Sequence, residues 1–183
     1  FCALAEARDN ETGNHIRRTR AYVRTLVEYL LQQPAQLERM PIEEWELIWK
    51  CAPLHDIGKV GIPDQILLKE GPLDVGEFEI MKRHTTLGRD ALSEAECGVD
   101  TQHPFLRIAS EIIYSHHERW NGKGYPEGLS GENIPFAARL MAIADVYDAL
   151  ISKRVYKPAM PHHKAVEIIV QGRGEQFDPL IVD

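Results

Sequence analysis

Apolar residues recur at helical spacing along nearly the whole chain, and no segment keeps the strict alternation of apolar and polar residues typical of a half-buried strand. The segment 136–151 is apolar on most of its sides, which predicts a central buried helix. Pro53 is expected to kink its helix, because proline has no backbone N–H to donate. We therefore predict an all-α bundle of about seven helices. The clearest of them span residues 14–31, 42–57, 74–91, 105–116, 136–151 and 161–172.

Glycine and proline residues divide these helices. The segment 58–72 contains three glycines and two prolines, which predicts loop and turns. Asp74, with Glu77 three residues later, predicts a capping box at the start of the following helix. The long loop expected over 120–135 carries Asn121-Gly122-Lys123-Gly124-Tyr125-Pro126, whose glycines let the backbone approach a ligand closely.

Histidine and aspartate side chains interrupt several of the apolar helical faces. His15, His84 and His116 each lie on a stripe of aliphatic or aromatic residues. Asp145 lies in the middle of the apolar segment 136–151, where a buried carboxylate needs a metal ion or a cation as partner. A lone histidine on an apolar face is more often a core or surface residue than a ligand. Recurrence on four helices indicates one shared metal centre instead.

The candidate ligands comprise five imidazoles and three carboxylates: Glu11, His15, His55, Asp56, His84, His116, His117 and Asp145. This number exceeds what one octahedral ion can use, so we expect two or three divalent ions. The mixed nitrogen and oxygen donors suit borderline divalent metals such as iron, manganese, nickel or zinc and argue against calcium. Among these metals we expect iron or manganese. His103, His162 and His163 flank prolines at helix ends and are expected at the solvent surface.

Cationic residues accompany these candidate ligands. Lys59 follows His55 by four residues, and Arg154 and Lys157 follow the central helix. Each of them alone fits a solvated side chain, and the glycine-rich loop alone fits a turn. Together, at the mouth of a metal site, they suit a phosphodiester substrate.

Size and charge narrow the class of protein. A chain of 183 residues fits a single domain, and 44% hydrophobic and 27% charged residues are ordinary for a soluble globular protein. The net charge of −7 argues against binding to a DNA or RNA polymer. No signal peptide or membrane-spanning run is visible, so we expect a cytoplasmic location. Three scattered cysteines, Cys2, Cys51 and Cys97, are expected to be free thiols.

The motifs resemble those of a known family. His55-Asp56-Ile57-Gly58-Lys59, followed by His116-His117-Glu118 and Asn121-Gly122-Lys123-Gly124-Tyr125-Pro126, is similar to the signature of the HD-GYP domain. This domain is the bacterial branch of the HD phosphohydrolase superfamily that hydrolyses cyclic di-GMP. The resemblance covers essentially residues 1–183, which it identifies as an HD-GYP catalytic domain. Because the chain starts at Phe1 and stops shortly after Phe177-Asp178-Pro179, we expect it to be an excerpt of a longer signalling protein.

The resemblance also implies roles for individual residues. The core metal ligands would be His55, Asp56, His84, His116, His117 and Asp145, with Asp56 bridging two ions. Glu11 and His15 match the positions that complete a third metal in trinuclear members. Asp56 and Lys59 are implied in catalysis. The implied substrate contacts are Asp9, Lys59, Gly124, Tyr125, Arg154 and Lys157.

The implied activity is a metal-dependent phosphodiesterase that cleaves cyclic di-GMP to pGpG, GMP or both. Metal ions about 3.5 to 4 Å apart can share one water and present hydroxide to the phosphorus. Two alternatives stay open: hydrolysis of another cyclic dinucleotide such as cyclic GMP-AMP, and a slow-turnover cyclic di-GMP sensor. The expected protein partners are an N-terminal regulatory domain such as a receiver, a second copy of the chain, or a diguanylate cyclase-type protein.

Overall fold

Apart from its α-helices and 3-10 turns, the described part of the chain has only loops and turns; the computed structural model describes residues 14–95, 103–153 and 159–183. These ranges contain no β-strand and only two isolated β-bridges. The all-α prediction is therefore confirmed, although short helices raise the number within these ranges to nine. They are α2 (His15–Leu30), α3 (Ile42–Cys51), α4 (Asp64–Leu67), α5 (Val75–Lys82), α6 (His84–Ala95), α7 (Pro104–Ser115), α8 (Phe136–Ile151), α9 (His162–Gln171) and α10 (Pro179–Val182).

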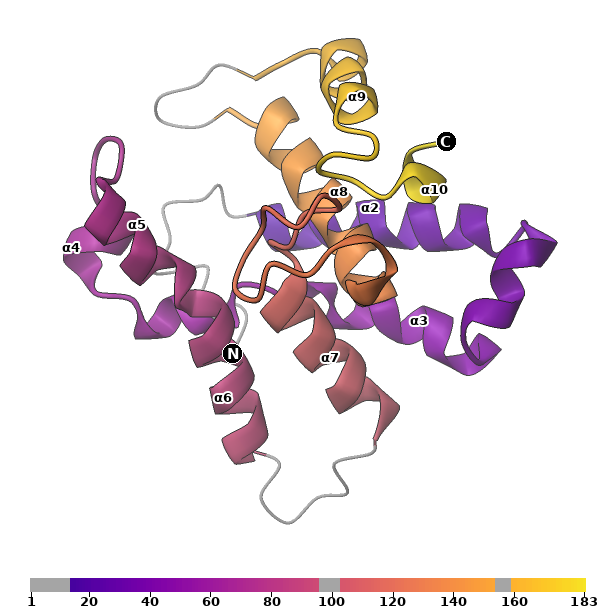
Figure 1. The fold of residues 1–183 in the computed structure, drawn as a ribbon, viewed down its shortest axis with the longest axis horizontal. Helices are drawn as coiled ribbons and strands as arrows, with labels where there is room; N and C mark the ends of the chain where they lie inside the picture. The colour runs from indigo at the N-terminus through magenta and orange to yellow at the C-terminus, as the bar shows by residue number, and fades with distance from the viewer. Residues whose placement is uncertain (1–13, 96–102, 154–158) are drawn as a thin grey trace.

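Helix α8 passes through the middle of the bundle, as its apolar sequence predicts (Figure 1). It packs against α2, α7 and α9, while α3 lies against α2 and α7. Helices α4, α5 and α6 lie at one side of the view (Figure 1), where α6 packs against α7. The core where these elements meet consists of aliphatic and aromatic side chains, among them Val23, Val27, Trp45, Ile48, Ile108, Ile112, Leu140 and Met141.

Two predicted helices differ from their predicted limits. Helix α3 ends at Cys51, and the chain continues as a 3-10 turn over Ala52–Leu54, because Pro53 cannot donate a helical hydrogen bond. The helix predicted over 74–91 begins with the expected capping box but breaks at Arg83 into α5 and α6. Around this break, His84, Thr85 and Thr86 donate side-chain hydrogen bonds to carbonyls three residues earlier, which compete with the helical backbone pattern.

The segment predicted as loop, 58–72, contains regular structure. A 3-10 turn spans Ile57–Gly61, and α4 follows directly after Pro63. Gly58 is pressed against α6 so closely that an added Cβ would lie 1.9 Å from the carbonyl oxygen of His84. This contact between turn and helix brings the residues just before Gly58 next to the first residue of α6.

The predicted loop over 120–135 joins α7 to α8 in front of the bundle (Figure 1). Gly122 and Gly128 adopt positive φ angles of 77° and 71°, which explains their identity. The Glu118 side chain holds the loop in place, since its Oε1 accepts hydrogen bonds from the backbone N–H groups of Glu127 (2.7 Å) and Gly128 (3.1 Å).

The remaining composition-based predictions concern membranes and thiols. None of the described helices is both long enough and apolar enough to cross a bilayer. Cys51 is a buried free thiol, as predicted, while Cys2 and Cys97 lie outside the described residues.

Candidate metal centre

Seven of the eight predicted ligands lie within the described residues, and the fold gathers all seven into two adjacent groups. The first group comprises Asp56, His84, His116 and His117, and the second comprises His15, His55 and Asp145. Within each group the candidate ligating atoms lie within 4.8 Å of one another. The eighth predicted ligand, Glu11, lies outside the described residues. Each group could therefore hold a metal ion.

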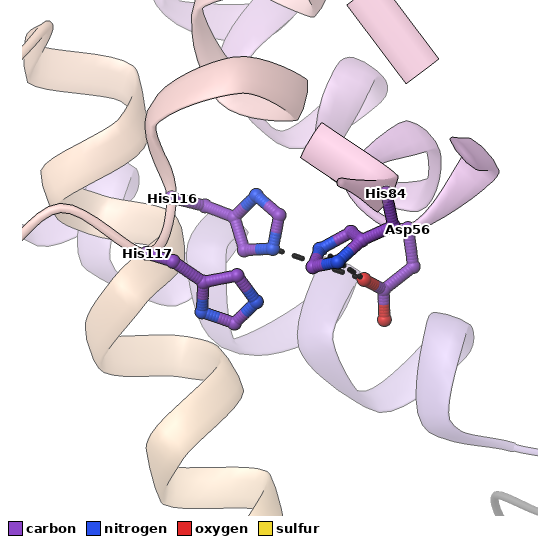
Figure 2. A group of neighbouring side chains, drawn as sticks. All are labelled: Asp56, His84, His116 and His117. Atoms are coloured by element: carbon purple, nitrogen blue, oxygen red, sulfur yellow. Dashed lines mark ion pairs between the residues drawn. The ribbon is translucent and has the colours of Figure 1, made fainter. Parts of the chain in front are cut away.

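The carboxylate of Asp56 lies between the two groups. Its Oδ1 lies 3.4 Å from Nε2 of His84 and 3.8 Å from Nε2 of His116, and Figure 2 shows both rings directed at it. Its Oδ2 lies 3.1 Å from Nε2 of His55 and 2.8 Å from Nζ of Lys59. Because its two oxygens face different groups, Asp56 has the arrangement that a bridging ligand needs.

Backbone carbonyls orient three of the histidines. The Nδ1 atoms of His55, His84 and His116 lie 2.9, 2.8 and 2.9 Å from the carbonyl oxygens of residues 52, 81 and 112. A carbonyl oxygen can only accept, so each Nδ1 carries the proton. In a neutral ring the lone pair then belongs to Nε2, which points into the centre, as in metal-ligating histidines.

The surroundings of two of these Nε2 atoms indicate whether the site fits a metal ion. Nε2 of His84 and Nε2 of His116 are buried and have no hydrogen-bond partner among the described residues. A buried polar atom without a partner typically costs about 1 to 3 kcal/mol, which is why proteins seldom keep one. The donor set suits borderline divalent ions, and an ion in the first group would satisfy both nitrogens.

Burial and neighbouring charges leave some of the candidate ligands neutral and others charged. Burial lowers the pKa of His84 and of His116, and it lowers the pKa of His117 to about 3, so these rings are neutral at pH 7. Burial acts in the same direction on His55, but the adjacent Asp56 carboxylate outweighs it and raises the pKa of His55 to about 9. Conversely, burial would raise the pKa of Asp56, but the neighbouring cations keep it well below its usual range. Without a metal ion, the protonated His55 ring and the Lys59 ammonium thus supply positive charge beside Asp56.

The fully buried carboxylate of α8 is not Asp145, which the sequence singles out, but Asp148 one turn later. The Asp145 side chain is 21% exposed, whereas that of Asp148 is 2% exposed. Asp148 accepts hydrogen bonds from Arg18 at 2.6 and 2.9 Å, and it lies 2.8 Å from Nδ1 of His15. It therefore directs Nε2 of His15 toward Asp145 (3.6 Å) and His55 (3.3 Å). A second aspartate one turn from Asp145 on an apolar helix is the signal that could have revealed it.

The described substrate-contact candidates line a cavity beside the two groups. It has two lobes, of about 370 Å³ and 320 Å³, and His117, Tyr125, Asp145 and Val146 line both. Lys59 lines the first lobe and Gly124 the second. The other predicted contacts, Asp9, Arg154 and Lys157, lie outside the described residues.

Packing explains the position of the Tyr125 side chain and of its loop. The Tyr125 ring lies 4.8 Å from the ring of His117, with an angle of 31° between the planes. At Gly124, an added Cβ would lie 2.4 Å from the backbone nitrogen of Arg119, so only glycine lets the loop pass this close. Burial raises the pKa of the Tyr125 phenol, which keeps it protonated as a hydrogen-bond donor at neutral pH.

Comparisons with known proteins agree with this architecture. A family model described as HD domain matches residues 3–181. A cyclic di-GMP phosphodiesterase of Vibrio cholerae is 56% identical over 99% of this chain, which spans 37% of that protein. A 3'3'-cGAMP-specific phosphodiesterase 2 of the same organism is 39% identical over 97% of this chain, which spans 31% of it.

A solved HDG"Y"P protein from Bdellovibrio bacteriovorus shares the fold. The match has a TM-score of 0.64 at 22% identity and covers 95% of this chain and 52% of that one. Its likeness supports the helical architecture, and the family model covers nearly all of the sequence. The resemblance inferred from the His-Asp and Gly-Tyr-Pro motifs is thus confirmed, and the chain belongs to the HD domain family.

Proposed function

We propose that this chain is the catalytic part of a metal-dependent phosphodiesterase that hydrolyses cyclic di-GMP. The observation that carries the proposal is the convergence of seven candidate ligands from distant segments beside a cavity lined by Lys59 and Tyr125. The Vibrio cholerae phosphodiesterase that is 56% identical over nearly the whole chain supports the choice of substrate.

In this proposal Asp56, His84, His116 and His117 would hold the first ion, and His15, His55 and Asp145 would hold the second. His15, which the resemblance assigned with Glu11 to a third ion, lies instead with His55 and Asp145. Divalent ions bound there supply Lewis acidity, which generates a nucleophile from water at neutral pH and offsets charge on the phosphate. Iron or manganese is the proposed metal, and Glu11 is the proposed ligand of a third ion.

The chain's own residues bind and orient the phosphodiester. Lys59 lies at the edge of the first group, where its ammonium can neutralise charge on a non-bridging phosphate oxygen or on the leaving 3′ oxygen. Tyr125 can donate a hydrogen bond to the phosphate, since its phenol stays protonated. Arg154 and Lys157, in the segment that follows α8 in the sequence, are proposed to bind the phosphate. The planar guanidinium of Arg154 suits two parallel hydrogen bonds to phosphate oxygens.

Cyclic GMP-AMP is the second candidate substrate. The 39% identical relative specific for 3'3'-cGAMP favours it as an alternative, because its similarity also extends along nearly the whole chain. Both substrates present the same phosphodiester to the metal groups and differ in one base. The choice between them therefore rests on residues that contact the bases. An N-terminal receiver, a homodimer and a diguanylate cyclase-type partner stay predictions.

A parallel turnover assay tests the proposal. The chain is purified anaerobically, loaded with Mn²⁺ or Fe²⁺, and incubated separately with cyclic di-GMP and 3'3'-cGAMP, and the products are separated by chromatography. We expect pGpG, GMP or both from cyclic di-GMP, loss of activity with a chelator, and recovery when the metal is restored. Absence of cyclic di-GMP turnover by metal-replete protein contradicts the proposal. Faster turnover of 3'3'-cGAMP selects the second candidate.

A further inference from the structure

An exposed aromatic residue lies at the end of the cavity away from Asp56 and Lys59. Phe78, on α5, is 43% exposed and lines the second lobe together with Tyr125. Single exposed aromatic residues are common on protein surfaces. Phe78 differs because its ring meets that of Tyr125 edge to face, with centroids 6.1 Å apart and an angle of 84°. Two aromatic rings thus form one corner of the cavity.

Two lysines add positive charge to this corner. Nζ of Lys82 lies 5.0 Å from the ring centroid of Phe78 and 5.6 Å from that of Tyr125. Lys123, in the glycine-rich loop, lines the same lobe, and its side chain forms no ion pair with a described residue. Lys82 also bonds to Glu79 at 2.6 Å, so Lys123 is the cation more available to a ligand. Aromatic faces beside cations are typical of sites that bind nucleotides, where bases stack and phosphates pair with cations.

The position of this lobe relative to the metal groups identifies the part of a ligand that would enter it. Candidate metal ligands line both lobes: Asp56 and His84 line only the first, His116 only the second, and Asp145 both. Lys59 lines only the first lobe, whereas Phe78, Lys82 and Lys123 line only the second. Both share His117 and Tyr125. Each lobe is near the lower end of the range of about 300 to 1,000 Å³ found for small-molecule sites. Because the two lobes share these lining residues, a ligand larger than one nucleotide can extend from one into the other.

We infer that the second lobe binds the nucleotide half that is not being cut, with its purine base stacked on Phe78 and its phosphate near Lys123 and Lys82. The inference rests on the proposed function, because it assumes a cyclic dinucleotide whose scissile phosphate lies at the metal groups. It assigns Phe78 to substrate binding, a residue that the sequence analysis did not single out.

The test compares steady-state hydrolysis of cyclic di-GMP by Mn²⁺-loaded wild type and three variants on α5. Phe78→Ala should raise the KM about 10- to 100-fold, the range expected when one base loses its aromatic stack. Phe78→Tyr should stay within threefold of wild type, since it keeps the ring. Val75→Ala is the matched control, because Val75 lies one turn earlier, is 82% exposed and does not line the cavity. Metal content and the circular dichroism spectrum should be the same in all four proteins.

Two lysine variants test whether Lys123 binds the phosphate of the uncut nucleotide. Lys123→Gln should raise the KM for cyclic di-GMP at least threefold and make it less sensitive to added salt. Lys164→Gln, at an exposed lysine of α9, should change neither quantity. An unchanged KM for Lys123→Gln overturns the inference that the phosphate lies near Lys123.

Failure of the inference is distinguishable from failure of the proposed function. If wild type hydrolyses cyclic di-GMP but Phe78→Ala keeps a KM within twofold of wild type, the second lobe does not bind the base and the inference alone is overturned. If metal-replete wild type hydrolyses neither cyclic di-GMP nor 3'3'-cGAMP, the proposed function and the inference are both overturned.

Discussion

Replacement of His116 by leucine separates the metal-ligand interpretation from the alternative that His116 is an ordinary core histidine. The substitution keeps a side chain of similar size in a fully buried position at the end of α7. It removes the unpartnered Nε2, whose burial costs about 1 to 3 kcal/mol. It also removes the hydrogen bond from Nδ1 to the carbonyl of residue 112, which contributes about 0.5 to 1.5 kcal/mol. That carbonyl keeps the backbone N–H of residue 116 as its donor.

The net effect depends on whether metal is present. In the presence of a chelator, the difference between these two terms predicts that His116→Leu lies between about 0.5 kcal/mol less stable and about 2.5 kcal/mol more stable than wild type. With Mn²⁺ at a hundred times the dissociation constant of the first group, wild type should gain about 2.7 kcal/mol from that group. The variant should lose this gain and keep only the gain from the second group, so Mn²⁺ should shift the relative stability in favour of wild type by about 2.7 kcal/mol.

Urea unfolding with chelator and with Mn²⁺ measures both effects, and His163→Leu, at an exposed position of α9, serves as the control. A variant that loses more than about 2 kcal/mol in chelator and gains as much stability from Mn²⁺ as wild type refutes the reasoning. That result would assign His116 to the hydrogen-bonded core and not to the metal groups.

Three further predictions concern neighbouring features. Asp148→Asn should weaken metal binding about 10- to 100-fold, because His15 loses the carboxylate that orients it, and metal titration measures this. Metal uptake at pH 7 should release about one proton from His55, whose pKa is raised to about 9, so metal affinity should increase with pH up to that value. Calorimetry in buffers of different ionisation enthalpy detects the proton, and a heat independent of buffer contradicts it. Gly124→Ala should lower the free energy of unfolding by about 1 to 3 kcal/mol, because its Cβ would collide with the backbone of Arg119.

The candidate ligands could be predicted from the sequence because each is an exception to a strong local pattern. His84 and His116 stand among apolar residues at helical spacing, and the structure places both in one buried group. Pairs such as His55-Asp56 mark the ends of helical segments, where a side chain can point along the helix axis into the centre. Such local exceptions remain visible without knowledge of the tertiary contacts.

Features that depend on distant contacts could not be predicted in the same way. Asp148 is paired with Arg18, which is 130 residues earlier, and nothing local indicates that pairing. The break at Arg83 is invisible to periodicity, because apolar spacing continues through it. Phe78 looks like part of an apolar helical face, yet it is exposed to the cavity. For Asp148 and Phe78 a contact between separate elements determines the outcome, whereas the break at Arg83 accompanies local side-chain hydrogen bonds that apolar spacing does not report.

Anomalous diffraction from crystals grown with Mn²⁺ or Fe²⁺ tests the central claim most directly. The account predicts at least two peaks within about 4 Å of each other, the spacing of two-metal sites. One peak should be contacted by Asp56, His84, His116 and His117, the other by His15, His55 and Asp145, with Asp56 between them. A single well-occupied peak, or peaks that touch neither group, would contradict it.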